Sequence, residues 1–299
     1  MAAPSPTPES PSFVDRLTHL DRRWLFLAMG LAIVLPLLRP ITLSFRVSNM
    51  VRNVYDEIER LPVGEVVLVS VDYDPASKPE LEPFTRAVVR HMLRRGLRPI
   101  FVTLWNTALP IVDAIIADII RGEYMQGTGY FEGHPHPDFL YGRDYLFLGF
   151  KDGKEAAIAG MGQNIGQLFP TDRVQHRPLA RLPIMQGKSS LRDFRLIVNS
   201  SAGFPGAKEY VEQVVTRYHL HFVAATTAVS VTDLTPYYPN QIVGLVGGMR
   251  GSAEYEQLIG WTGTGTAGLN VLTFGQLLVI AAIVLGNIIF FLERRRGKR

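Results

Sequence analysis

Residues 65–105 form a strand–helix–strand pattern, the feature that most constrains how this chain can fold. Residues 66–71 are short, β-branched and almost entirely apolar, which is typical of a strand buried on both faces of a parallel sheet. A helical stripe of apolar residues follows, and residues 100–104 repeat the buried-strand pattern. Two parallel strands joined by a helix require a layered α/β domain, in which the crossover is almost always right-handed.

Local signals mark both ends of the helix in this unit. Ser77, Pro79 and Glu80 have the spacing of a capping box with a proline in the first turn. Two arginines occupy the expected last turn, where they complement the helix dipole, and Gly96 follows them as a helix terminator. We therefore expect a helix that begins after Ser77 and ends before Gly96.

The same alternation of strands and helices continues towards the C-terminus. We expect further strands at residues 145–150, 194–199 and 222–231, and further helices at residues 107–120, 155–168, 207–219 and 240–260. This order predicts an α/β fold with a five-stranded, mostly parallel, doubly wound sheet of the flavodoxin-like or Rossmann-like kind. The sheet domain is inserted between an N-terminal and a C-terminal transmembrane helix.

Two apolar segments flank this domain. Residues 271–292 are mainly apolar and long enough to cross a bilayer. The first segment, residues 24–41, has arginines before it and an apolar core of about fifteen residues, so a cleaved signal peptide is an alternative. No small-x-small cleavage site follows it, which favours a retained anchor.

These patterns divide the chain into seven parts. They are a disordered cytoplasmic N-terminus (1–23), a transmembrane helix (24–41), an amphipathic connecting helix (42–62), the extracytoplasmic α/β domain (63–262), a Gly/Thr linker (263–270), a second transmembrane helix (271–292) and a basic cytoplasmic tail (293–299). The amphipathic helix either packs on the domain, which we favour, or forms a stalk or lies in the membrane interface.

Charge supports a membrane topology rather than a nucleic-acid partner. Residues 293–299 carry five positive charges and one negative charge, which accounts for the whole net charge of +4. The basic character is therefore a membrane-flanking tail, and no nucleic-acid partner is expected. The positive-inside rule places both termini in the cytoplasm and the domain outside it, in a two-pass protein of the cell (inner) membrane.

Polar residues at the expected strand ends form the candidate pocket, because doubly wound sheets bind ligands there. These residues are Asp72, Tyr73, Asp74, Asn106, Lys151, Ser200, Ser201 and Thr227. Asp72 and Asp74 could bind a divalent cation or act as acid and base. We favour a structural role for both, since no third ligand converges on them. No catalytic residue can be assigned, and the sequence requires no cofactor.

Two other motifs are weaker indications of a functional site. His134, His136 and Asp138 alternate in an extended segment and could hold a metal, although a closed zinc site needs a fourth ligand and a polar loop is favoured. The chain has no cysteine, so thiolate sites and disulfides are excluded. Gly263 and Gly265 begin a Gly-x-Gly-x-x-Gly match, but no strand precedes it, which favours a linker over a phosphate loop.

Glycines in the last expected helix suggest a packing surface. Gly244, Gly248 and Gly251 would share one face of a helix over residues 240–260, and such a face permits close approach of a second helix. Packing within the chain is favoured over contact with another protomer. The expected partners are therefore the lipid bilayer, together with protein partners or a homo-oligomer formed through the membrane helices or this glycine-rich helix.

Several short motifs are similar to those of a family of uncharacterised bacterial and archaeal membrane-anchored proteins. They are Asp72-Tyr-Asp74-Pro, Pro79-Glu80, Gly160-Met-Gly162, Pro183-Ile-Met185, Ser201-Ala-Gly203, Pro205-Gly206, Gly247-Gly248 and Ala253-Glu-Tyr-Glu256. The resemblance covers most of the extracytoplasmic domain and implies no activity and no catalytic residue. We expect a non-enzymatic scaffold, assembly or ligand-sensing subunit of a membrane complex. The alternative is a membrane-anchored hydrolase or metal-dependent enzyme that acts around Asp72 and Asp74.

Overall fold

The computed structural model describes residues 21–38 and 46–296. The chain divides into two compact units. One unit, Thr42–Thr266, contains the sheet, and the other combines Met1–Ile41 with Ala267–Arg299.

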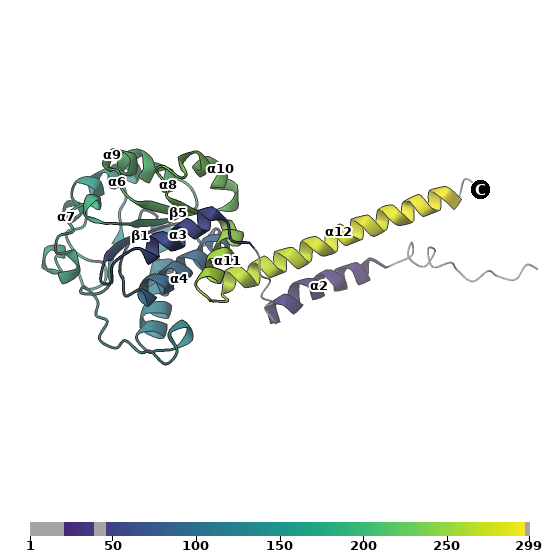
Figure 1. Ribbon diagram of the computed structural model, residues 1–299, viewed down its shortest axis with the longest axis horizontal. Coiled ribbons are helices and arrows are strands. Elements are labelled where there is room, and N and C mark those ends of the chain that lie inside the picture. The colour runs from purple at the N-terminus through teal and green to yellow at the C-terminus, as the bar shows by residue number, and fades with distance from the viewer. Residues whose placement is uncertain (1–20, 39–45, 297–299) are drawn as a thin grey trace, which may run out of the picture. The chain divides into compact units, whose positions relative to one another are not determined.

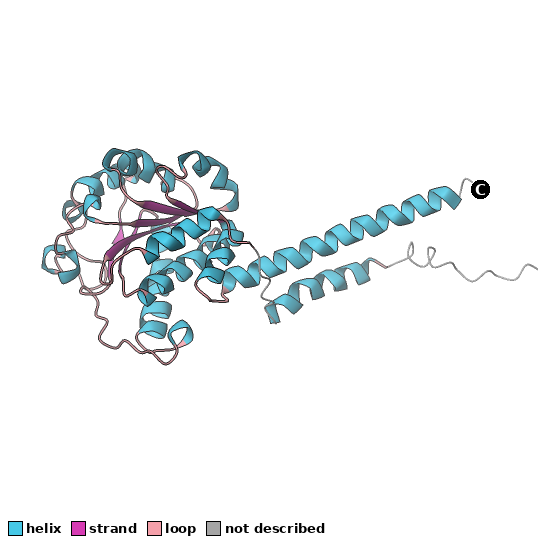
Figure 2. Cartoon of the chain, viewed as in Figure 1, coloured by secondary structure: helices cyan, strands magenta, loops and turns pink. Residues whose placement is uncertain are grey.

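The sheet has six strands, all parallel (Figure 2). They are β1 (Val66–Asp72), β2 (Arg98–Thr103), β3 (Leu146–Phe150), β4 (Ile197–Ser201), β5 (Phe222–Thr226) and β6 (Gly244–Gly247). Their order is β3-β2-β1-β4-β5-β6, the order of Rossmann-type sheets, with the topological switch between β1 and β4. The predicted parallel α/β fold is confirmed, whereas the predicted number of strands is one too low.

The missing strand lies where a continuous helix was predicted. Residues 240–260 instead form β6 and then α11 (Gly248–Leu258), and Gly248 at the junction has φ +55°. Gly244, Gly248 and Gly251 therefore share no helical face, and the predicted face is wrong. A Cβ on Gly244 would lie 2.6 Å from the backbone nitrogen of Val54, so this glycine lets a neighbouring helix pack directly on the strand. Glycine is rare in strands, which explains the misassignment.

Helices cover both faces of the sheet (Figure 1). One face carries α3 (Asn49–Glu59), α4 (Lys78–Arg94), α5 (Leu109–Ile115), its π-helical continuation η2 (Ile116–Tyr124), and α11. The other carries α6 (Lys154–Gln163), α7 (Ile165–Leu168), the continuous run α8, η7 and α9 (Ala207–Tyr210, Val211–Val215, Thr216–Tyr218), and α10 (Val231–Leu234). Short 3₁₀ turns complete the domain: η1 (Asn106–Ala108), η3 (Gly129–Phe131), η4 (Leu179–Arg181), η5 (Pro183–Met185), η6 (Leu191–Asp193), η8 (Ala228–Ser230) and η9 (Thr235–Tyr237).

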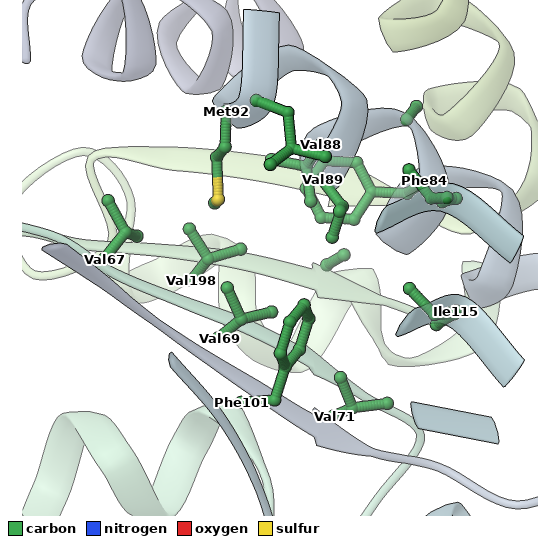
Figure 3. Packing of buried hydrophobic residues seen from close by; sticks show 14 of the residues in the cluster. Val67, Val69, Val71, Phe84, Val88, Val89, Met92, Phe101, Ile115 and Val198 are labelled. Atoms are coloured by element: carbon green, nitrogen blue, oxygen red, sulfur yellow. The ribbon is translucent and has the colours of Figure 1, made fainter. Parts of the chain in front are cut away.

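The central strand β1 is buried along all of its residues, as its apolar sequence predicts. Val67, Val69 and Val71 belong to the core beneath α4, where Val88 and Met92 pack towards them (Figure 3). The alternate residues of β1 face the opposite core, which includes α6 and α8. Full burial of each valine contributes about 1.5–3 kcal/mol, so β1 anchors both halves of the core.

The start of α4 differs from the predicted capping box. Ser77 makes no side-chain cap; its own N–H donates to Asp74 Oδ1 at 2.9 Å. Glu80 accepts a hydrogen bond from the N–H of Ala228 at 2.8 Å and so ties α4 to the loop after β5. The end of α4 agrees with the prediction, because Gly96 follows with φ +67°.

The helix α3 packs on the domain. Val51, Val54 and Ile58 are buried in the core that also contains α4 and α11. This is the arrangement favoured from the sequence for the amphipathic segment. Residues 42–45 of that segment lie outside the described residues.

In the second unit, one helix is long and apolar enough to cross a membrane. It is the segment Thr264–Phe291 of α12 (Thr264–Arg296), and no second candidate occurs among the described residues. The earlier apolar segment forms α2 (Arg22–Leu38), whose apolar part, Arg23–Pro36, is shorter than a span. Residues 39–41 of the first predicted span, most of the predicted N-terminus and residues 297–299 lie outside the described part of the chain.

Candidate functional site

Asp72 lies at the carboxyl end of β1, next to the topological switch, and its side chain is fully buried. Ser70 Oγ donates to Asp72 Oδ2 at 2.5 Å, and Asn199 Nδ2 donates to the same oxygen at 2.8 Å. The N–H of Leu104 donates to Asp72 Oδ1 at 2.6 Å. Both carboxylate oxygens are thus engaged by groups from β1, β4 and the end of β2.

This network continues into the helix layer. Tyr210 donates from its hydroxyl to Ser70 Oγ at 2.9 Å, which links α8 to β1. Burial raises the pKa of Asp72 to about 7, although its three hydrogen bonds act to lower it. The Oδ1 atom of Asn199 is buried without a hydrogen bond. A protonated Asp72 could donate to that oxygen after an amide flip, so the network can hold one proton more or less.

Tyr73 and Ser200 face the other side of the sheet. The Tyr73 hydroxyl donates to Thr85 Oγ1 at 3.3 Å, and Thr85 Oγ1 lies 3.1 Å from Ser200 Oγ. Burial raises the pKa of Tyr73 above its usual range. The sequence neighbours Asp72 and Tyr73 therefore belong to separate networks, because successive strand residues point to opposite faces.

The remaining predicted pocket residues are dispersed. Asp74 holds the turn before α4, and the Ser77 N–H lowers its pKa. Asn106 is exposed and Lys151 is half-buried in the loop after β3. Thr227 is buried and donates to Ser230 Oγ at 3.2 Å. Both aspartates accept backbone N–H groups, which is the arrangement expected for structural rather than chemical roles.

A tryptophan bridges the switch point. Trp105 Nε1 donates to the carbonyl oxygen of Pro205 at 2.8 Å, joining the loop after β2 to the loop after β4. Since β2 and β4 flank β1, this contact crosses the carboxyl end of β1. The turn between β1 and α4 also contains no glycine, whereas a dinucleotide fingerprint requires several there. The Trp105 contact therefore lies across the place where this topology usually binds its ligand.

A cavity of about 190 Å³ lies at the next pair of strand ends, beside β4 and β5. Its polar lining comprises Ser201, Lys208, Glu209, Thr226, Ser230 and Asp233. Sequence reasoning selected Ser201, named Thr226 among the strand-end residues without placing it in the pocket, and missed Glu209. The available signals were that Thr226 ends an otherwise apolar buried strand and that Glu209 is the third residue of a helix.

The structure does not bring the three side chains of the histidine loop together. His134 and His136 line one hollow of about 720 Å³ together with Arg94, whose positive charge opposes a bound cation. The His136 ring stacks on Tyr124 with centroids 4.1 Å apart, and Asp138 lines a neighbouring hollow. Within residues 21–38 and 46–296, no three His, Cys, Asp or Glu side chains are grouped so that they could hold a metal ion.

His91 lies in another buried polar cluster, between α3, α4 and α11. His91 Nδ1 is 2.7 Å from the Tyr255 hydroxyl, and Nε2 is 3.0 Å from Glu59 Oε1. Burial lowers the pKa of His91 to about 4, so the ring is neutral at pH 7. Since His91 and Tyr255 are fully buried, this acid–histidine–hydroxyl arrangement holds three helices together rather than meeting a substrate.

The glycine motif at residues 263–268 binds the carboxylate of Glu256, a residue of the same chain. Glu256 accepts hydrogen bonds from the N–H groups of Gly263, Gly265 and Thr266 at 3.1, 3.0 and 2.7 Å. A Cβ on Gly263 would lie 2.4 Å from Glu256 Oε1, which explains the need for glycine. The predicted linker at residues 263–270 is wrong in form, because the helix α12 already begins at Thr264.

The fold and site thus define a Rossmann-ordered α/β domain whose switch point is filled by its own side chains. No family model, no curated protein and no solved structure matches this chain.

Proposed function

We propose that this protein is a non-enzymatic, membrane-anchored scaffold, assembly or ligand-sensing subunit of a membrane complex. The observation that carries the proposal is the state of the switch point. Asp72 is fully buried with both oxygens hydrogen-bonded, and Asp74 holds a turn. A general base or a metal ligand needs a lone pair that a substrate or ion can reach, and Asp72 offers none. Asp74 is partly exposed, but its Oδ1 accepts the Ser77 N–H and so serves the turn before α4.

The membrane topology follows from the apolar helices and the charges beside them. The apolar part of α12 is long enough to anchor the chain, and the basic residues 294–299 support a cytoplasmic C-terminal end under the positive-inside rule. With the first apolar segment as a second span, both termini are cytoplasmic and the α/β domain lies outside. A subunit anchored in this way would act through partner chains or self-association.

The rival function is a hydrolase or metal-dependent enzyme that uses Asp72. One observation favours it: the pKa of Asp72, about 7, suits acid–base chemistry near neutral pH. Against it, Asp72 has no exposed surface, and Trp105 crosses the strand end next to it.

Purification of the full chain in mild detergent, followed by native mass spectrometry, tests the proposal. We expect co-purifying partner chains or a defined homo-oligomer, and no stoichiometric metal. A bare monomer that carries one metal ion per chain would overturn the proposal in favour of the rival.

The predicted topology is testable separately, because the chain has no cysteine. We expect Val63→Cys, at a position 76% exposed, to react with a membrane-impermeant maleimide in intact cells. Lys298→Cys in the tail serves as the matched control and should react only after the membrane is opened. Labelling of both variants, or of Lys298→Cys alone, in intact cells would contradict the topology.

A further inference from the structure

We propose that the cavity at the carboxyl ends of β4 and β5 is a binding site for a small ligand that carries an ammonium group. This inference goes beyond the proposed function, since it assigns a ligand class to a place outside the Asp72 network. The cavity measures about 190 Å³ and lies at the strand edge where parallel α/β sheets bind their ligands. It lies beside the filled crevice, one strand farther along the sheet.

The first observation is an unpaired buried hydroxyl. Thr226 is only 2% exposed and lines the cavity, yet its hydroxyl makes no hydrogen bond with any residue that the structure describes. Its neighbour Thr227 donates to Ser230. The hydroxyl oxygen is not one of the side-chain atoms sealed from solvent without a partner, so it is open to a partner from outside the chain that enters the cavity.

The second observation is a half-used carboxylate. Glu209 is 7% exposed, and its Oε2 accepts the N–H of Gly206 at 2.7 Å. Among the residues that the structure describes, no donor hydrogen-bonds to its Oε1 and no cationic side chain pairs with it. This oxygen is not one of the side-chain atoms sealed from solvent without a partner, so it is open to a ligand, and an ammonium group is a strong donor for it.

The charges around the cavity select a cationic ligand. Asp233 adds a second carboxylate to the lining. Lys208 is the one cation among the lining residues, and it is exposed and pairs with Glu212 at 3.9 Å. Pockets for drug-sized ligands measure about 300–1,000 Å³, so this smaller cavity fits a compact amine such as ethanolamine or a small amino acid.

Calorimetric titration of the full chain in detergent micelles tests the inference. The probes are ethanolamine, glycine and L-alanine, with acetate and glycerol as matched compounds that lack the ammonium group. We expect saturable binding of at least one ammonium probe, and no binding of acetate or glycerol. The native oligomer or its partners need not be known, so this result and the partner analysis can fail independently.

Two substitutions locate the site. Glu209→Gln keeps an acceptor for Gly206 but removes the charge, and we expect binding to weaken about ten- to hundredfold. Thr226→Val removes only the hydroxyl and should weaken binding about three- to tenfold. Glu132→Gln is the matched control, because it makes the same charge change at an exposed residue outside the cavity lining, and it should leave binding unchanged.

Three results would overturn the inference. The first is no binding by any ammonium probe at about 10 mM, the upper limit of useful affinity. The second is equal weakening by Glu209→Gln and Glu132→Gln, which would indicate general surface charge. The third is binding of glycerol or acetate in preference to the amines. Circular dichroism of each variant establishes that it is folded, and Thr226→Val provides the test if Glu209→Gln is not.

Discussion

Asp72 and Glu209 lie at the same edge of the sheet and differ in how fully the chain uses them. Both are more than nine-tenths buried, and both accept a backbone N–H group. Asp72 accepts three hydrogen bonds from within the chain, whereas Glu209 accepts one. The fold thus hydrogen-bonds both oxygens of Asp72, whereas one oxygen of Glu209 remains available to a ligand.

Topology explains the difference. Asp72 is the last residue of β1, so donors from the end of β2 and from β4 converge on it, whereas Glu209 lies on the helix α8 and not on a strand. Beyond β5 the chain turns away through η8 and α10, and Ser230 and Asp233 in these turns line the cavity instead of filling it. The switch point, which usually binds the ligand in this topology, is here a structural centre.

The largest expected effect is that of Asp72→Ala on stability. The substitution leaves the Leu104 N–H and the Asn199 amide buried without an acceptor, and we expect a loss of about 3–5 kcal/mol. Urea unfolding of the full chain in detergent measures it. Asp72→Asn is the control and should cost less, because Asn199 can turn its unpaired Oδ1 towards the new amide. A loss of unfolding free energy below about 1 kcal/mol for the alanine variant would contradict the structural role assigned to Asp72.

The next effect is pH dependence. The pKa of Asp72 is raised from 3.8 to about 7, so protonated Asp72 favours the folded state. The stability that this contributes is fully present below about pH 3.8 and is lost as the pH rises through 7. His91 acts in the opposite direction. Its pKa is lowered to about 4, so stability from the neutral ring is present above about pH 6.5 and falls as the pH drops towards 4.

A difference measurement isolates Asp72 from His91. Between pH 5 and pH 8, wild type should lose about 2–3 kcal/mol relative to Asp72→Asn, which retains His91. Unfolding free energies of both proteins over that range provide the measurement. Parallel pH profiles would mean that Asp72 stays ionised throughout, and the contrast with Glu209 would then rest on hydrogen bonds alone.

Glu256 is a second saturated carboxylate and should behave as Asp72 does, on a smaller scale. In Glu256→Ala, the N–H groups of Gly263, Gly265 and Thr266 lose their acceptor, which for a helix start costs about 1–2 kcal/mol. Amide hydrogen exchange should therefore quicken about ten- to thirtyfold at these positions. Glu256→Gln retains one acceptor oxygen and is the control. Unchanged exchange in the alanine variant would show that other contacts fix this turn.

The sequence predicted the parts of the fold that depend on local pattern. The apolar runs of β1 and β2, the stop at Gly96 and the packing of α3 all follow from periodicity and residue type. It failed at β6, because Gly244 serves the close approach of Val54, a neighbour distant in the chain. The capping role predicted for Glu80 was wrong for the same reason, because its hydrogen-bond partner, Ala228, is also distant in the chain.

The candidate site was predictable only as a location. Strand ends could be named from the sequence, and Ser201 lines the cavity there. Whether a polar atom is satisfied depends on neighbours from distant elements, as Leu104 and Asn199 show for Asp72. The unpaired atoms of Thr226 and Glu209 could be found only when all other donors and acceptors were in place.

The smallest expected effect is that of the cavity residues on stability. Thr226→Val should change the unfolding free energy by less than about 1 kcal/mol, because the lost hydroxyl has no partner among the described residues. Glu209→Gln should be similarly mild, since the amide oxygen can still accept the Gly206 N–H and a half-paired buried charge is removed. If either variant lost more than about 2 kcal/mol in urea unfolding, that residue would belong with Asp72 as part of the fold. If both variants keep nearly the stability of the wild type but bind amines more weakly, Asp72 serves folding and Glu209 serves binding. An atom that makes no hydrogen bond within the fold can be removed without loss of stability.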